Sequence, residues 1–451
     1  MSVNPADSQI FGSLFGTDEM RALMSDRAQL AAMLEVEAAL ARAEAALGMV
    51  PAEAAARITA AARPEILSID KIAASTRVVG YPVVELVAEL AAAAGGDAAR
   101  YVHLGATTQD IVDTAMVLQI RRAAAIIRRD LIATARALAE HARRYRDTPI
   151  AGRTHLQHAV PTSFGLKCAM WAAPLAAHVA RIDQAAERIF VVQFGGAAGT
   201  LASIGANGWK VADALARELG LRAADLPWHT ARDRFAEAAA LLAMVCGSVS
   251  KFALDITLLG QTEVAEVFEP YTFGTGSSST MPQKRNPILS EYILAASRAV
   301  HALVPIMFSA MTQDHERATG PWQSEALAIP QIFVLSAGTL ARAHELAAGM
   351  IADPARMRQN LDASGGLIMA EALAARLTPA MGRANAHHAV SQACDRARAQ
   401  KRALGEVIAE DAELGLHLPR EEILRALDPA GYLGSAGVFV DRVVARIATL
   451  E

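Results

Sequence analysis

The amino-acid sequence predicts an all-α protein, and three observations support this. Of its 451 residues, 53% are hydrophobic but only 5% are aromatic, so Ala, Leu, Val and Ile carry the apolar mass, as in closely packed helices. Between Gly105 and Pro149 there is neither Gly nor Pro, and apolar residues recur at helical spacing. No stretch of useful length alternates between apolar and polar residues, as a half-buried strand would.

Shorter and longer helical segments divide the chain into three predicted domains. Residues 1–106 form an N-terminal helical domain, with its clearest segments at Ala22–Leu47 and Val84–Ala94. Residues 107–352 form a central domain of long helices, and residues 353–451 form a small C-terminal helical domain. The long central candidates are the stretch after Gly105, Pro161–Arg188, Asp233–Glu269, Ile288–Ala318 and Gln331–Ile351. The short C-terminal candidates are Met369–Leu377, Arg383–Gln400 and Arg420–Leu427.

Two of the central segments, Cys168–Arg181 and Phe235–Lys251, carry almost no charge. A helix that is apolar on nearly every side must be buried on every side. We therefore expect the central helices to pack against other subunits as well as against one another.

Charge and cysteine content exclude several classes of protein. The chain has 43 Lys and Arg against 47 Asp and Glu, so no overall basic field attracts a nucleic acid. Cys168, Cys246 and Cys394 lie far apart and lack the spacing of a metal site or a disulfide framework. The N-terminus has no signal-peptide pattern, and the uncharged stretch Ile189–Trp209 is too rich in glycine for a membrane span. We expect a soluble cytoplasmic protein with no membrane partner.

The segment Glu269–Pro287, EPYTFGTGSSSTMPQKRNP, interrupts two apolar helices. Its glycines and prolines cannot continue a helix, and hydroxyl, cationic and amide side chains gather in it. Such a loop can move and bind an anion, although a flexible linker could have the same composition. The spacing of a phosphate-binding P-loop is absent.

Two earlier segments also carry polar groups suited to an anion. His103–Thr114, HLGATTQDIVDT, places Thr107 and Thr108 at the start of the long helix, where backbone N–H groups favour a carboxylate. The same residues could serve only as helix caps. Gly152–Pro161, GRTHLQHAVP, contains His155, whose side chain titrates near neutral pH but could also be structural.

In this order the three segments resemble the conserved regions of the fumarase/aspartase superfamily, and SSTMPQKRNP matches its signature loop, SSxMPxKxNP. Segments along nearly the whole chain resemble one family within it, the 3-carboxy-cis,cis-muconate cycloisomerases; they include QTEVAEVFEP from Gln261, QDHERATGPWQSE from Gln313 and LDPAGYLGSAG from Leu427. The resemblance implies a three-domain helical homotetramer whose active sites each draw the three segments from different subunits. It also implies a small tricarboxylate substrate, lactonized in protocatechuate degradation (the β-ketoadipate pathway), and no metal or organic cofactor.

The resemblance assigns the catalytic roles. Ser278, the first serine of the SSxMP pattern, becomes the residue that transfers the proton, and His155 becomes a second catalytic residue that positions the substrate and stabilises charge. The sequence departs from the usual pattern at Ser277, where glycine is common, and at Gln283, where several branches have histidine.

The expected substrate-binding residues all offer hydroxyl, amide or cationic donors to a carboxylate. Arginines enter this set because a substrate with three negative charges needs several cations, although a surface ion pair is the alternative role for each arginine. The set consists of Thr107, Thr108, Gln157, Lys284, Asn286, Arg317 and Arg153.

Adenylosuccinate lyase, of the same superfamily, is the competing interpretation. That enzyme normally has a histidine in its N-terminal domain, within a THDV-like segment. Here the corresponding stretch, Thr76–Val84, reads TRVVGYPVV, and no histidine precedes His103. A catalytically silent homologue is a second alternative, and the joint presence of the serine, lysine, asparagine and histidine of the pattern argues against it.

Overall fold

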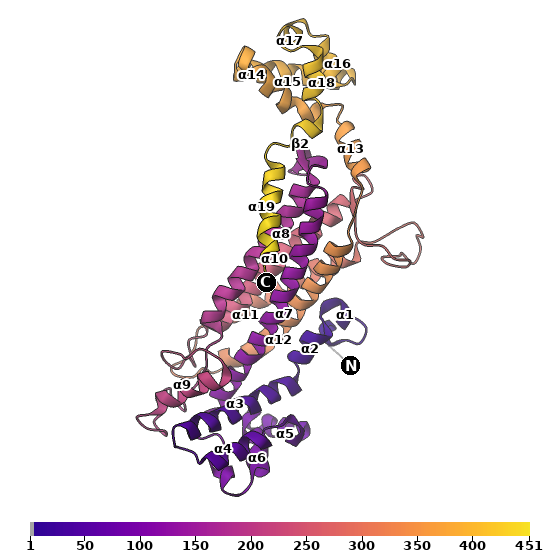
Figure 1. Ribbon diagram of the computed structural model, residues 1–451. Coiled ribbons are helices and arrows are strands. Elements are labelled where there is room, and N and C mark those ends of the chain that lie inside the picture. Colours follow the sequence, from indigo (N-terminus) through magenta and orange to yellow (C-terminus); the bar gives the residue numbers. More distant parts are fainter. Residues whose placement is uncertain (1–3) are drawn as a thin grey trace. The chain divides into compact units, whose positions relative to one another are not determined.

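A computed structural model describes residues 4–451, except the side chain of Glu413. It confirms the all-α prediction, because helices make up most of the chain and the strands are few and short (Figure 1). By its internal contacts the chain forms two compact units. One unit holds the residues up to Asp130, His178–Gly247 and Ala295–Ala341, and the other holds Leu131–Ala177, Ser248–Leu294 and Arg342–Glu451.

Five long helices supply residues to both units. Each has one face of small or aliphatic side chains; in α7, for example, Ile120, Ile127 and Leu131 are buried at the spacing of one helical stripe. At 1.5 Å per residue, the 37 residues of α7 extend about 55 Å. The five helices are α7 (Thr108–Arg144), α8 (Phe164–Ile189), α10 (Asp233–Leu259), α11 (Ile288–Ser309) and α12 (Pro321–Gly349).

The first unit also holds the shorter N-terminal helices and α9. Hydroxyl side chains cap several of them, as Ser25 does by accepting a hydrogen bond from the backbone N–H of Ala28. Helix α3 packs mainly against α4 and α9. The elements are η1 (Pro5–Asp7), α1 (Gly12–Phe15), α2 (Asp18–Leu23), α3 (Asp26–Ala46), α4 (Ala52–Ala61), η2 (Pro64–Ile66), α5 (Ile69–Val79), α6 (Val83–Ala94), η3 (Gly96–Tyr101) and α9 (Gly208–Leu219).

The second unit holds four strands and the C-terminal helices. Strands β1 (Pro149–Thr154) and β2 (Gln157–Ser163) form an antiparallel hairpin, and β3 (Val267–Phe268) pairs with β4 (Ile351–Ala352). Helices α14 to α18 share a separate small core (Figure 1). The helical elements are α13 (Pro354–Asp362), η4 (Leu367–Met369), α14 (Ala370–Met381), α15 (Arg383–Gln400), α16 (Leu404–Ala409), α17 (Ala412–His417), α18 (Arg420–Ala426), η5 (Pro429–Gly431) and α19 (Ala436–Ala448).

The hairpin corrects the expectation that no strand would occur and that a helix would start at Pro161. Its turn residues, His155 and Leu156, have φ of 51° and 63°, a conformation usually signalled by Gly or Asn. Helix α8 starts only at Phe164, where the Ser163 hydroxyl accepts a hydrogen bond from a backbone N–H of the first turn. The connection predicted at Ile189–Trp209 is confirmed, since 190–207 contain no helix. The three domain boundaries stay a prediction.

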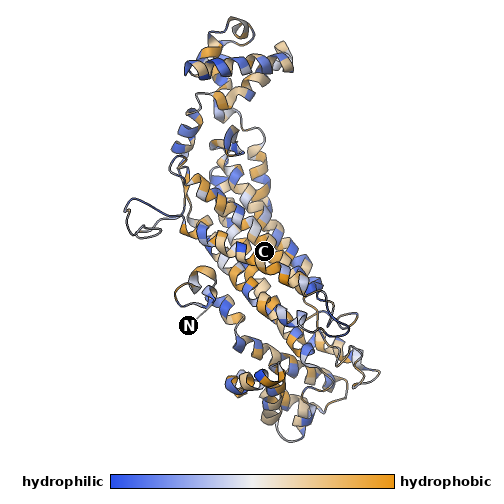
Figure 2. Cartoon of the chain, turned by 180° about the vertical axis from the view of Figure 1, so that it is seen from behind, coloured by the Kyte–Doolittle hydropathy of each residue, from blue (hydrophilic) through white to orange (hydrophobic). Residues whose placement is uncertain are grey.

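Helices α10, α11 and α12 are long and apolar enough, by length and composition alone, to cross a membrane. Within the chain, 50%, 33% and 67% of their most apolar windows are buried. Figure 2 shows apolar residues continuing along the long helices, in orange. The apolar surface that stays open needs cover from another molecule, as the subunit packing expected from the sequence would provide. The tetramer itself stays a prediction.

Candidate active site

The loop between β3 and α11 contains the segment Glu269–Pro287, and hydrogen bonds hold its two ends together. The Glu269 carboxylate accepts hydrogen bonds from the backbone N–H groups of Leu289 (3.0 Å) and Ser290 (2.8 Å) and from the Ser290 hydroxyl (2.6 Å). A carboxylate in this place satisfies the free N–H groups of the first turn of α11 and is favoured by the helix dipole. One side chain therefore holds the two ends of the loop together.

Above the base, the loop narrows to a neck. Ser277 pairs with Arg285 in an isolated antiparallel bridge, and the Asn286 N–H donates to the Gly276 carbonyl at 2.8 Å. Gly276 has φ of 64°, and a Cβ there would lie 2.4 Å from the Asn286 carbonyl oxygen, so only glycine fits. Ser278 and Lys284 directly follow and precede the two bridged residues, so they open and close the loop tip along the chain.

The tip residues are available for chemistry. Ser278 is half-buried, and its Oγ accepts the backbone N–H groups of Thr280 (3.3 Å) and Met281 (3.1 Å). Lys284 is exposed, and no carboxylate among the described residues pairs with it. Lys284 and Asn286 line a cleft of about 780 Å³ at the base of the loop. The loop thus presents a hydroxyl, an unbalanced positive charge and an amide.

The β1–β2 hairpin carries His155 and Gln157 at its exposed end. Next to the turn, Arg153 pairs with His158 in the hairpin, and its guanidinium makes two 2.8 Å bonds to the buried Glu266 carboxylate. Asn360 of α13 donates a further 2.8 Å bond to Glu266. The charge of Arg153 is therefore balanced inside the chain, which favours the ion-pair role; its assignment to the substrate stays a prediction.

The start of α7 carries Thr107 and Thr108, both half-buried. The Thr107 hydroxyl accepts a hydrogen bond from Arg317 Nη1 at 3.2 Å, and the other terminal nitrogen of Arg317 donates to the carbonyls of Ala197 (2.9 Å) and Gly196 (3.4 Å). All three acceptors are neutral, and no described carboxylate pairs with Arg317. Arg317 therefore keeps its positive charge beside the threonines, as a carboxylate-binding residue needs.

Asp110 hydrogen-bonds to Thr107, and His229 hydrogen-bonds to Asp110. The sequence alone predicts little of the role of these two residues. Asp110 is fully buried, and its carboxylate accepts the backbone N–H of Thr107, which makes Asp110 part of the helix cap. No sequence motif points to His229. It lies 119 residues from Asp110 along the chain, so no local pattern could join the two.

His103, which opens the HLGATTQD segment, is held by Glu37 of α3 through a 2.6 Å contact with Nδ1. Burial lowers the pKa of His103, but the hydrogen bond and charge of Glu37 outweigh burial, so the pKa lies above its ordinary 6.5. The segment is thus anchored to the N-terminal helices at one end and to α7 at the other.

Comparison with known proteins identifies the chain's relatives. A family model described as "Lyase" matches residues 15–301, and one described as "Adenylosuccinate lyase C-terminus" matches residues 366–443. A Pseudomonas aeruginosa protein named 3-carboxy-cis,cis-muconate cycloisomerase is 47% identical, with 99% of this chain and 98% of that protein aligned. A protein of the same name from Bradyrhizobium diazoefficiens is 43% identical, with coverage of 98% and 99%. The solved 3-carboxy-cis,cis-muconate lactonizing enzyme of Pseudomonas putida superposes with a TM-score of 0.92 at 43% identity, covering 98% of this chain and 100% of that one.

The chain belongs to the fumarase/aspartase superfamily of lyases.

Within this superfamily member, the expected site residues form separate groups. Ser278, Lys284 and Asn286 lie on one loop, and Thr107 lies against Arg317. No hydrogen bond or ion pair between described residues joins the Ser278 loop to the His155 turn, and both views show the loop as a separate projection (Figures 1 and 2). Across residues 4–451, no three His, Cys, Asp or Glu side chains gather as metal ligands would.

Proposed function

We propose that this enzyme is a 3-carboxy-cis,cis-muconate cycloisomerase, which lactonizes its tricarboxylate substrate to carboxymuconolactone in the β-ketoadipate pathway of protocatechuate degradation. The observation that carries the proposal is identity of 43–47% over nearly the whole chain to several proteins of that name. The presence of Ser278, Lys284 and Asn286 in the loop supports it further.

The reaction is an internal addition. A carboxylate oxygen of the substrate forms a C–O bond to one carbon of a double bond conjugated with another carboxylate. The π electron pair moves to the neighbouring carbon and onto that carboxylate, which stabilises the carbanion. A proton then completes the new C–H bond. No electron leaves or enters, so the chemistry needs only positioning, charge stabilisation and a proton donor.

Ser278 supplies the proton in this proposal. A serine hydroxyl can do so only if its alkoxide is stabilised, because its ordinary acidity is low. The loop tip provides two kinds of group for that purpose: the N–H groups of Thr280 and Met281 bond to Ser278 Oγ, and the Lys284 ammonium is supplied by the same loop. Solvent returns a proton to the serine after turnover.

His155 and Gln157 position the substrate and stabilise its charge. The carboxylate that leaves in the reverse direction is a weak base, so it needs no acid to protonate it. Arg317, with the Thr107 and Thr108 segment, holds a carboxylate at the start of α7. Its three neutral acceptors leave its charge free, and the substrate brings the opposite charge.

The active site in this proposal is shared between the subunits of a homotetramer in the cytoplasm. Two observations support sharing. No hydrogen bond or ion pair joins the loop to the His155 turn among the described residues, and the long helices keep apolar surface open. A monomer would then lack a complete site, and its isolated chain would be inactive.

A spectroscopic assay tests the function. Lactonisation removes a conjugated diene, so we expect the ultraviolet absorbance of 3-carboxy-cis,cis-muconate to fall when the enzyme is added. Adenylosuccinate is assayed in parallel, because one family model of that lyase matches residues 366–443. Turnover of adenylosuccinate alone would reverse the assignment. Turnover of neither would favour a silent homologue.

A further inference from the structure

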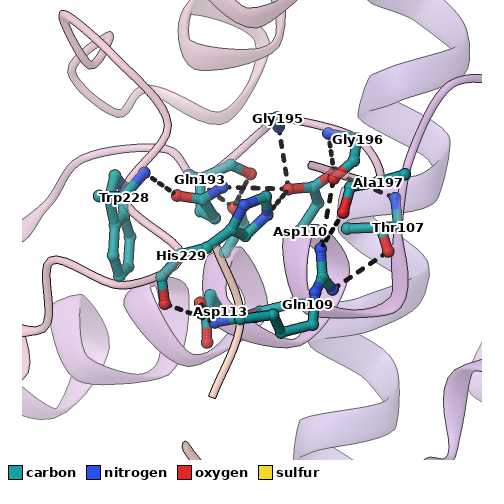
Figure 3. Close-up of polar contacts among 12 residues, drawn as sticks. Thr107, Gln109, Asp110, Asp113, Gln193, Gly195, Gly196, Ala197, Trp228 and His229 are labelled. Atoms are coloured by element: carbon teal, nitrogen blue, oxygen red, sulfur yellow. Dashed lines mark hydrogen bonds and ion pairs between the residues drawn. The ribbon is translucent and has the colours of Figure 1, made fainter. Parts of the chain in front are cut away.

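The buried carboxylate of Asp110 is the structural centre of the Arg317 cradle, defined here as Thr107, Gly196, Ala197 and Arg317. Its Oδ1 accepts hydrogen bonds from His229 Nε2 (2.7 Å), Gln193 Nε2 (3.1 Å) and the Gly195 N–H (2.9 Å). Its Oδ2 accepts the N–H groups of Gly196 (2.9 Å) and Thr107 (3.0 Å) (Figure 3). Five donors therefore converge on one anion that water does not reach.

The two partners of Oδ2 are two of the three residues that accept hydrogen bonds from Arg317; the third, Ala197, follows Gly196 in the chain. Thr107 receives Arg317 on its hydroxyl, and Gly196 receives it on its carbonyl. The direction of the Asp110 carboxylate therefore fixes the distance between the helix start and the glycine-rich segment. Because the Thr107 hydroxyl accepts from Arg317, its own O–H stays free to donate to a bound carboxylate.

His229 and Gln193 are the two side chains that hold the direction of the Asp110 carboxylate. A carboxylate only accepts, so His229 Nε2 carries the proton in this contact. The backbone of His229 is tied to the same helix turn, since its carbonyl accepts Gln109 Nε2 at 2.9 Å. The neighbouring Trp228 N–H donates to Gln193 Oε1, so Gln193 is held as well (Figure 3). His229 is only 4% exposed and cannot touch a substrate directly.

We propose that His229 is a positioning residue: through Asp110, it holds Thr107 and Arg317 at the spacing that binds a substrate carboxylate. Loss of the His229 donor lets the carboxylate turn, and the two Oδ2 contacts lengthen. The predicted effect is on ground-state binding of the carboxylate rather than on proton transfer. The proposal rests on the proposed function only for its kinetic readout.

The test compares His229→Phe with His229→Gln in the full-length enzyme. Phe keeps the ring but has no donor, whereas the Gln amide can donate to Asp110. A hydrogen bond to a charged group is worth enough to change affinity by roughly tenfold to a hundredfold. We expect H229F to raise KM for 3-carboxy-cis,cis-muconate by about that factor with kcat within about threefold, and H229Q to restore KM. H388F and H388Q, at an exposed position of α15, serve as controls and should change neither constant.

Calorimetric binding of tricarballylate, a tricarboxylate that cannot react, separates this proposal from the function. We expect wild type and H229Q to bind it and H229F to bind roughly tenfold or more weakly. Equal binding by wild type and H229F, or no binding by wild type, would overturn the proposal. A loss in H229F that H229Q fails to restore, or that falls on kcat and thermal stability alone, would indicate a purely structural role. If H229F binds tricarballylate more weakly than wild type but wild type does not turn over carboxymuconate, the positioning role of His229 stands and the proposed function is wrong.

Discussion

Glu44 gives the sharpest stability prediction. It lies on α3, fully buried, and neither carboxylate oxygen has a hydrogen-bond partner among the described residues. Burial, with a smaller contribution from the charge of Glu37, raises the pKa of Glu44 from 4.5 to about 8. A neutral carboxylic acid is therefore the stable form of this side chain in the folded protein at neutral pH.

The consequence for stability follows from proton linkage. The folded state holds the Glu44 proton more tightly than the unfolded state. The stability that this proton contributes is therefore fully present below about pH 4.5 and is lost as pH rises through about 8. The difference between the two pKa values, 4.5 and about 8, corresponds to about 5 kcal/mol in the free energy of unfolding. About 3 kcal/mol of this is lost by pH 7. Glu44→Gln is uncharged at every pH and removes this dependence.

We expect the Tm of E44Q relative to wild type to rise steadily from pH 5 to pH 8, by on the order of several degrees. Thermal unfolding is followed by circular dichroism at one fixed protein concentration, because assembly also affects Tm. E53Q, on the exposed face of α4, is the matched control and should show a flat difference. A flat difference for E44Q as well would refute a buried, unpartnered acid at this position.

Three further predictions concern the active site. Ser278→Ala should lower kcat by roughly a hundredfold to ten-thousandfold, since it removes the proton donor, whereas His155→Gln should cost less; an equal or larger loss in steady-state assays of H155Q would reject this division of roles. Arg317→Gln should raise KM by roughly tenfold to a hundredfold, because a charged partner of the substrate carboxylate is lost, and an unchanged KM would place the carboxylate elsewhere. Glu269→Ala should release the loop base, so limited trypsin digestion should cut faster within the loop than in wild type; equal cutting rates would show that other contacts close the loop.

The sequence predicts the long helices because each has an unbroken stripe of apolar residues, as in α7. It also locates the loop, since prolines and glycines interrupt the helical pattern at Glu269–Pro287. The hairpin escaped prediction because its turn uses His155 and Leu156 in a left-handed conformation without glycine. Periodicity over a few residues cannot reveal such a turn.

The candidate site is predictable only in part. The motif residues follow from the resemblance, but their internal partners come from distant segments. Glu266 balances Arg153 across 113 residues, and Arg317 reaches Thr107 across 210. Such pairings depend on how helices pack, which a single sequence does not encode as a local pattern. These pairings determine that Arg153 is paired with a carboxylate of the chain and that Arg317 has only neutral acceptors, so Arg317 can pair with a substrate carboxylate.

Proton delivery to a single carbon of carboxymuconate is the central claim, and one measurement tests it most directly. Wild-type enzyme is run on 3-carboxy-cis,cis-muconate in D₂O, and the product is analysed by NMR. We expect a lactone with a single solvent-derived deuterium on the carbon beside the new C–O bond, in one stereochemical orientation, because a fixed donor reaches one face. Unreacted diene, or deuterium divided between both orientations, would contradict the claim.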